Sequence, residues 1–196
     1  MLLMQGEPAG PAPSDSADDA HLLVRIAGKD LRAFEELYRA YQPRLARFLR
    51  TILRRAPLVE EVLDDTMLVV WSHPDRFNGK SKVSTWIFAI AYRKALKALR
   101  RHDEPIEDKY AETRESTEAG PEQQVRQRQL QEALMSAINQ LSQDHRAVVD
   151  LTYFHGIGYR EIAEIMACPV DTVKTRMFHA RRYLKDKLSG RLADWL

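Results

Sequence analysis

The stretch CPVDTVKTRMFHARRYLKDKL, residues 168–188, predicts one amphipathic helix with two faces of opposite character. At 100° per residue, side chains three and four positions apart share a face. Between residues 169 and 188, six Lys or Arg side chains stand against two Asp, a local balance of +4. One face is an apolar stripe suited to a core, made of Val173, Met177, Ala180 and Leu184. The other is basic and bears a hydroxyl and an aromatic ring, and it comprises Lys174, Thr175, Phe178, His179, Arg181 and Arg182.

The residues before this helix indicate what its basic face contacts. YREIAEIM, residues 159–166, predicts a short helix, and Cys168 and Pro169 follow it in a tight turn. Two helices joined in this way form a helix-turn-helix, whose first helix crosses the DNA backbone while the second enters the major groove. Lys and Arg would neutralise phosphates, and Thr175 and His179 could read base edges. The alternative for any lone basic face is a solvated surface.

Elsewhere apolar residues recur at helical spacing and nowhere alternate as in a strand, so the sequence predicts an all-α protein. Three helices are expected in the N-terminal half, at about residues 34–52, 59–70 and 84–101. Pro43 should bend the first of them and Ser84 should cap the third. The second helix carries Met67 on its inward face and its carboxylates outward.

An acidic segment separates the two halves. Residues 102–122 hold eight acidic residues, two prolines and few side chains that could be buried, which is typical of a flexible linker. The sequence therefore predicts two small helical domains on one tether. We expect a disordered leader at 1–19, an N-terminal domain at 20–102, a linker at 103–122, a helix-turn-helix domain at 123–188 and a tail at 189–196.

Composition limits the possible functions. With 196 residues, 44% of them hydrophobic, the chain can bury two small cores. Its net charge of only +2 does not by itself indicate nucleic-acid binding, so such an indication must come from where the charges lie along the chain. The one cysteine excludes an internal disulfide, and no His, Cys or acidic cluster has metal-ligand spacing. No phosphate-binding loop or nucleophile motif occurs, so we expect no enzyme, no metal and no cofactor. Without a signal peptide or an apolar run of about 20 residues, we expect a cytoplasmic protein with no membrane insertion.

A second basic surface is predicted at the end of the third N-terminal helix, where residues 92–101 carry five cations and no acid. The loop before it, FNGKSKVSTW at residues 77–86, combines Gly, Lys and Trp86 and could hold a splayed single strand. The alternatives are a solvated helix end whose cations complement the helix dipole, and Trp86 as an ordinary core residue. Two weak DNA-binding modules on one tether would together select spaced sites.

Three segments in this order resemble the extracytoplasmic-function sigma factors of bacterial RNA polymerase: VEEVLDDTMLVVW (59–71), RFNGKSKVSTWIFAIAYRKALKALRR (76–101) and LSQDHRAVVDLTYFHGIGYREIAEIMACPVDTVKTRMFHARRYL (141–184). The resemblance covers about residues 22–188. It implies an all-helical initiation factor that binds core polymerase and directs promoter recognition, DNA melting and transcription initiation, often in a stress response. Members of this family are often held inactive by an anti-sigma factor, so such a partner is expected as well.

The resemblance also implies roles for individual residues. The helix at 59–71 would dock on the clamp of the largest polymerase subunits through Glu61, Asp64, Asp65, Met67, Leu68 and Trp71. The downstream, minus-ten element would be recognised as melted DNA by Asn78, Lys80, Ser81, Lys82, Trp86, Arg93, Lys94, Lys97, Arg100 and Arg101. The upstream, minus-thirty-five duplex would be recognised by Tyr159, Thr172, Lys174, Thr175, Phe178, His179, Arg181 and Arg182.

Two other functions stay open at the level of sequence. A free-standing helix-turn-helix regulator would bind duplex DNA tightly without polymerase, and its N-terminal domain would serve as an interaction module. For a signalling adaptor with incidental basic helices, the affinity for any DNA would show no strong dependence on salt concentration. A sigma factor should instead bind weakly alone, gain specificity with core enzyme, and associate with the nucleoid only as part of the holoenzyme.

Overall fold

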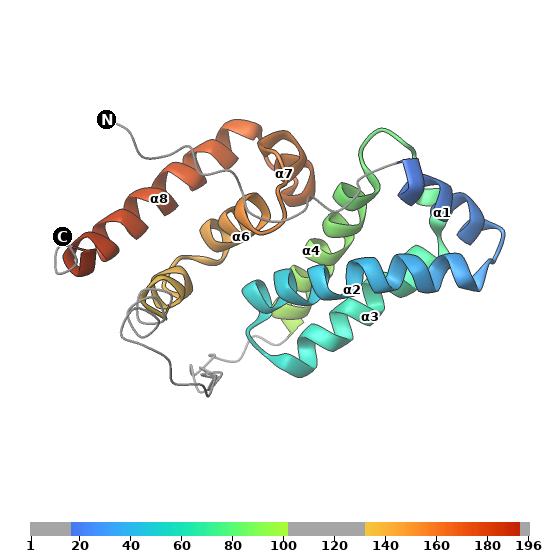
Figure 1. Ribbon diagram of the computed structural model, residues 1–196, viewed down its shortest axis with the longest axis horizontal. Helices are drawn as coiled ribbons and strands as arrows, with labels where there is room; N and C mark the ends of the chain where they lie inside the picture. The colour runs from blue at the N-terminus through green and yellow to red at the C-terminus, as the bar shows by residue number, and fades with distance from the viewer. Residues whose placement is uncertain (1–16, 102–131, 193–196) are drawn as a thin grey trace, which may run out of the picture.

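The computed structural model describes residues 17–101 and 132–192, and every regular element in these ranges is a helix, which confirms the predicted all-α class (Figure 1). The N-terminal half comprises α1 (Ala17–Ala27), α2 (Leu31–Leu53), α3 (Ala56–Ser72), the short 3-10 helix η1 (Pro74–Arg76) and α4 (Val83–Arg101). The C-terminal half comprises a helical segment at 132–139, then α6 (Gln143–Tyr153), α7 (Tyr159–Met166) and α8 (Val170–Leu192).

Local chemistry sets the ends of the N-terminal helices. The Asp30 carboxylate caps α2 by accepting hydrogen bonds from the backbone N–H groups of Arg32 and Ala33, at 3.0 and 3.2 Å. Arg54 closes the same helix in the left-handed conformation, with φ of 54°. The helix continues through Pro43, whose ring is exposed. The helices predicted at 34–52, 59–70 and 84–101 are thus confirmed as parts of α2, α3 and α4.

The hydrophobic core of the N-terminal half lies between α2, α3 and α4. Phe48 of α2 and Phe88 of α4 are fully buried, and their ring centroids lie 5.3 Å apart. Met67 and Val70 of α3 complete this core from the third side. Because these rings and aliphatic side chains meet from three helices, the loop between η1 and α4 is held at one end of a rigid bundle.

The helix-turn-helix of the C-terminal half has the predicted geometry. Ser142 caps α6, and Ala167 ends α7 in the left-handed conformation, with φ of 50°. Pro169 then directly precedes α8 and accepts the N–H of Thr172 at 3.0 Å. The predicted inward stripe of α8 is confirmed for Val173, Met177 and Ala180, which are all at most 1% exposed, and its last member, Leu184, is partly buried against the same core.

Three predicted boundaries differ from the structure. Helix α1 begins at Ala17, inside the predicted leader, because the buried Asp19 carboxylate accepts a 2.6 Å hydrogen bond from the Tyr41 hydroxyl and holds this helix against α2. Ser84 is buried inside α4, which begins at Val83, so its predicted capping role is wrong. Helix α8 runs on to Leu192, past the predicted start of the tail. The predicted linker at 103–122 lies outside the described residues.

The two halves pack directly on each other. Helix α4 lies against α7, and α2 lies against α6, so the buried side chains of both halves form one continuous apolar cluster. Figure 1 shows α7 and α6 beside α4 and α2 near the middle of the molecule, with α1 and the far end of α8 at its two extremes. The sequence predicted two domains on a tether, and the structure adds that they are docked.

Candidate nucleic-acid interface

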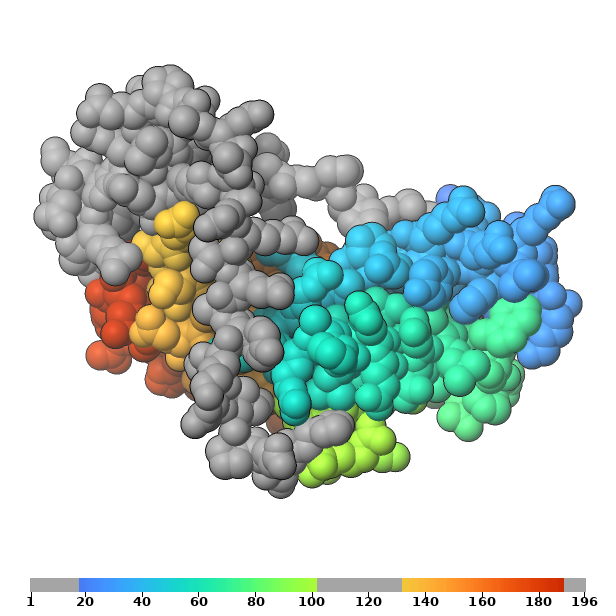
Figure 2. Space-filling view, turned by 90° about the horizontal axis from the view of Figure 1, so that it is seen from below, coloured from blue at the N-terminus to red at the C-terminus, as the bar shows by residue number. Residues whose placement is uncertain are grey.

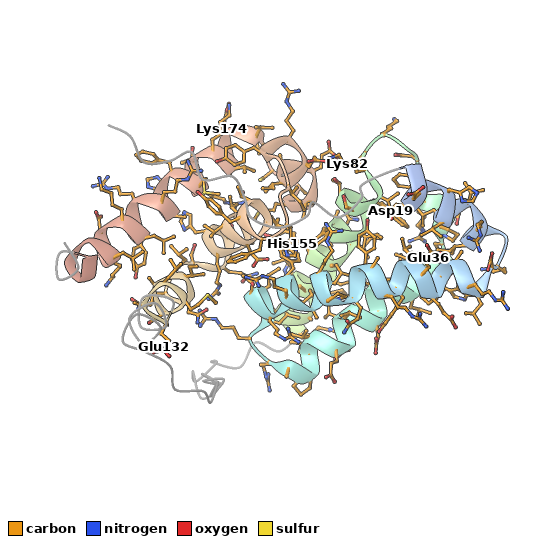
Figure 3. The ribbon with its side chains drawn as sticks, viewed as in Figure 1. Asp19, Glu36, Lys82, Glu132, His155 and Lys174 are labelled. Carbon is orange, nitrogen blue, oxygen red and sulfur yellow. The ribbon has the colours of Figure 1, made fainter. Side chains whose placement is uncertain are left out.

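The outer face of α8 is one of the two basic surfaces that the sequence predicted. The buried stripe of Val173, Met177 and Ala180 fixes the rotation of the helix, so the opposite side chains point into solvent. Phe178 is 61% exposed on this face. Figure 3 shows Lys174 directed away from the body of the molecule. A basic, hydroxyl-bearing helix with an exposed aromatic ring matches a major-groove reading helix.

The residues predicted to read the upstream element differ in how free they are to contact DNA, because some are bonded within the protein and some are half-buried. Lys174 forms a 2.9 Å ion pair with Asp171, one turn earlier, and both side chains are well exposed. Thr175 donates its hydroxyl to the Asp171 backbone carbonyl at 2.9 Å. Arg181 donates from Nε to the Tyr153 hydroxyl at 3.0 Å. Of the others, His179 and Arg182 are exposed, whereas Tyr159 and Thr172 are half-buried.

Two side chains that the sequence analysis did not select hold α8 in place. Arg176 forms an ion pair with Asp144 of α6 and lies 3.6 Å from the Cys168 sulfur in the turn. Tyr92 of α4 donates to the same Asp144 at 3.3 Å, and burial, together with the Asp144 charge, raises the pKa of Tyr92 to about 12. Arg176 and Asp144 are 32 residues apart in sequence, so no local pattern could have paired them.

His145 is a further residue at this surface that the sequence did not reveal. Its ring lies 6.2 Å from that of His179, and its Nδ1 lies 2.6 Å from the Ser142 hydroxyl. Burial, and then the nearby charges of His179 and Arg176, lower the pKa of His145 below its ordinary value. A neutral imidazole therefore stands beside the reading face at physiological pH.

The second surface begins in the loop between η1 and α4. The Asn78 side chain accepts the N–H of Lys80 at 3.0 Å, and Gly79 between them has φ of 71°, a conformation that glycine adopts without strain. Trp86 is half-buried, with its ring centroid 5.6 Å from that of Phe77, so it supports the loop from one side and shows the other to solvent. Ser81 is half-buried.

The cations of α4 divide into two groups. Lys94 and Arg101 each form a 3.0 Å ion pair with the acidic face of α3, to Asp65 and Glu61 respectively. Figure 2 shows this side of the molecule, with α2 and α3 above the C-terminal end of α4. Exposed pairs of this kind contribute at most about 1 kcal/mol, so phosphates could displace them. The second group of α4 cations faces solvent and comprises Arg93, Lys97 and Arg100.

The outer face of α3 carries the residues expected to bind polymerase, with one correction. Leu68 is 58% exposed beside the exposed Glu61 and Asp64. Trp71 is half-buried, with its ring centroid 5.1 Å from that of Phe34. Met67 is 1% exposed and lies in the core, so its predicted contact with a partner is wrong and its inward place in the helical periodicity is correct. Burial, and then the Asp64 charge, raise the pKa of the neighbouring Tyr38.

The described ranges contain no group of three or more His, Cys, Asp or Glu side chains that could hold a metal ion. Nor does either range contain a helix long and apolar enough to cross a membrane. The side chains on the two basic surfaces suit the recognition of nucleic acid: cations for phosphates, hydroxyl and imidazole groups for base edges, and aromatic rings for stacking.

Comparisons with known proteins agree with this geometry. Residues 37–104 match the family model "Sigma-70 region 2", and residues 131–184 match "Sigma-70, region 4". The chain is 29% identical over 185 residues to an ECF RNA polymerase sigma-E factor of Haemophilus influenzae, covering 89% of this chain and 97% of that protein. It is 28% identical over 186 residues to an RNA polymerase sigma-H factor of Pseudomonas aeruginosa, covering 90% and 96%.

Two solved structures share the fold over most of the chain. CnrH in complex with the cytosolic domain of CnrY is 23% identical, with a TM-score of 0.64, covering 88% of this chain and 98% of that one. The sigma factor RpoE in complex with the anti-sigma factor NepR from Bartonella quintana is 24% identical, with a TM-score of 0.60, covering 80% and 96%. Both halves of the present structure therefore recur together in other proteins.

Proposed function

This chain belongs to the sigma-70 family, with region 2 in its N-terminal half and region 4 in its C-terminal half, and we infer from this that it is an RNA polymerase sigma factor of the extracytoplasmic-function type. It binds core RNA polymerase and promoter DNA and directs transcription initiation. The observation that carries this conclusion is the presence of both regions in one chain. A free-standing helix-turn-helix regulator would need only the second, so that alternative is not favoured.

The roles of the individual surfaces are part of the proposal. The domain at 20–102 would bind core polymerase through the outer face of α3 and read melted minus-ten DNA through the loop at 77–86 and the exposed cations of α4. The domain at 123–188 would read the minus-thirty-five duplex through α8. Leu68 and Phe178 support these assignments because each is an exposed apolar side chain within a charged surface, Leu68 beside Glu61 and Asp64 and Phe178 among the cations of α8.

A regulatory partner and a cellular location follow from the proposed function as a sigma factor. We propose an anti-sigma factor as a regulatory partner, since RpoE of Bartonella quintana is solved with one. Members of the family are initiation factors, and this chain alone would catalyse no reaction. It would work in the cytoplasm and associate with the nucleoid within the holoenzyme.

The test of this function is in vitro transcription from a pool of genomic promoter fragments with purified core polymerase, with and without this protein. Protein-dependent transcripts that share two spaced upstream motifs are expected. The absence of transcripts, together with tight binding of the isolated protein to duplex fragments, would refute the sigma factor function. Leu68→Glu should abolish core binding, whereas Val24→Glu, which also introduces a carboxylate at an exposed apolar site but on α1, should leave it intact.

A further inference from the structure

Tyr153, which the sequence analysis did not select, lies at the C-terminal end of α6 and reaches the reading helix α8. Figure 1 shows α6 beside α8, and the two helices are in contact. The Tyr153 hydroxyl accepts the 3.0 Å hydrogen bond from Nε of Arg181, and the guanidinium carbon lies 5.8 Å from the centre of the Tyr153 ring. Tyr153 is 48% exposed and Arg181 is exposed as well, so this pair is open to a ligand from solvent.

Contacts on either side of Tyr153 hold its backbone in place. Leu151, two residues earlier, is fully buried and anchors the last turn of α6 in the core. The N–H of Phe154 donates to the Asp150 carbonyl at 3.0 Å and closes that turn. The Phe154 ring turns to the N-terminal half, where the guanidinium carbon of Arg47 lies 3.6 Å from the ring centroid. Tyr153 therefore extends from a fixed backbone toward α8.

Arg181 lies on one flank of α8, between the buried stripe and the reading face. Lys174, seven residues earlier, shares this flank, since the two positions differ by only about 20° around the helix axis. A helix with its side chains is about 10–12 Å across, and the major groove is about 12 Å wide, so the flanks of a helix in the groove meet the phosphates that border it. The flank of Arg181 and Tyr153 would therefore face a phosphate strand.

The hydrogen bonding of this pair suits a phosphate. Arg181 gives only its Nε hydrogen to Tyr153, and within residues 17–101 and 132–192 its other four N–H donors have no acceptor. The Tyr153 oxygen accepts that bond, so its own proton remains available to a second acceptor. Guanidinium and hydroxyl thus offer donors side by side, next to a full positive charge. Because Tyr153 already holds the guanidinium, less side-chain freedom is lost when an anion binds.

We propose that Tyr153 and Arg181 form one phosphate-binding site of the upstream interface, in which Tyr153 positions the guanidinium and donates its own hydroxyl proton to the same DNA phosphate. The site would fix the register of α8 in the groove and read no base itself. This proposal rests on the proposed function, because a promoter supplies the phosphate. The affinity of the pair for duplex DNA can nevertheless be measured on the isolated chain.

The test compares Tyr153→Phe with Tyr183→Phe, which removes a hydroxyl on the opposite side of α8, where it donates to Gln140 at 3.0 Å. Holoenzymes assembled with each variant are titrated at low salt, by fluorescence anisotropy, against the promoter selected in the fragment pool and against the same duplex with its upstream element scrambled. Tyr153→Phe should bind both duplexes about threefold or more weakly, by the same factor, whereas Tyr183→Phe should bind like the wild type. Circular dichroism and urea unfolding verify that both variants are folded.

Arg181→Ala tests whether the two side chains act together. It should weaken binding more than Tyr153→Phe and lower the slope of log affinity against log salt concentration by about one, because one phosphate contact is lost. The double variant should bind as weakly as Arg181→Ala alone, since the hydroxyl is held at the phosphate only through the guanidinium.

Unchanged binding by Tyr153→Phe would overturn the proposal. A loss confined to the intact upstream element would make Tyr153 a base-reading residue and would overturn the phosphate assignment. Losses that simply add in the double variant would overturn the shared site. If the chain does not bind core polymerase, the proposed function fails, and the same titrations of the isolated chain on a mixed-sequence duplex at low salt decide the phosphate site.

Discussion

Neighbouring residues on α8 should have opposite roles, and replacing each by Ala tests the assignment of its two faces. Met177 is 1% exposed and packs into the core, whereas Phe178 is 61% exposed on the basic face. Removing a buried Met side chain leaves a cavity and costs about 2–5 kcal/mol. Removing an exposed ring costs at most about 0.5 kcal/mol of stability. Although Phe is the larger residue, Met177→Ala should therefore destabilise the protein much more than Phe178→Ala.

The effects on DNA should follow the reverse order. An apolar contact with a thymine methyl belongs to the base-reading interactions that contribute about 1–3 kcal/mol each, so Phe178→Ala should weaken recognition of the upstream element roughly fivefold or more. Stability is measured by urea unfolding followed by circular dichroism, and recognition by transcription with core polymerase from a promoter selected in the fragment pool. Met177→Leu, which nearly conserves volume, serves as the control for the core position and should cost less than about 1.5 kcal/mol.

Two results would refute this reasoning. If Phe178→Ala lowered the urea midpoint as much as Met177→Ala, the ring would be part of the packing and not of a contact surface. If Phe178→Ala transcribed normally from the selected promoter, the exposed ring would not touch DNA, and the reading face would have to lie elsewhere on the domain.

Other predictions concern both DNA-reading surfaces and pH. Replacing Thr175 and His179 together by Ala should lower selectivity for the upstream element by roughly tenfold or more while leaving core binding unchanged, as measured by pull-down and transcription; lost core binding would contradict the assignment. Reversing Lys97 and Arg100 to Glu should impair promoter opening, followed by permanganate footprinting, through lost phosphate contacts. The lowered pKa of His145 means that the unfolded chain binds the proton more readily, so stability is complete above about pH 6.5 and falls as the pH decreases below it. His145→Gln should lose less stability between pH 7 and 5 in thermal unfolding.

The sequence predicted the features that depend on local spacing. The apolar stripe of α8, the turn before it and the three N-terminal helices follow from periodicity and from residues that cap or break helices. Met67 shows the limit of assigning a role by resemblance. The resemblance implied a contact with polymerase, whereas the helical periodicity placed Met67 inward, and the structure agrees with the periodicity. The predicted roles of the other site residues remain predictions.

Features that depend on distant residues could not be predicted. The ion pairs of Lys94 and Arg101 with α3 join residues 29 and 40 positions apart, and nothing in the run of cations distinguishes these two from their neighbours. The docking of the two domains could not be predicted from the sequence for a related reason. An acidic, proline-containing connection indicates independent modules, whereas the interface is made by scattered side chains such as Arg47 and Glu161.

The hydrogen bond from Thr175 to the carbonyl of Asp171 limits which bases this residue can recognise. An oxygen that has given its only proton to its own helix presents lone pairs alone to the groove, so it can accept but not donate. In the major groove the donors are the amino groups of adenine and cytosine, while guanine and thymine offer acceptors at the equivalent edge. As long as that bond persists, Thr175 can distinguish amino bases from keto bases, and its methyl group remains as the one feature it can offer to thymine.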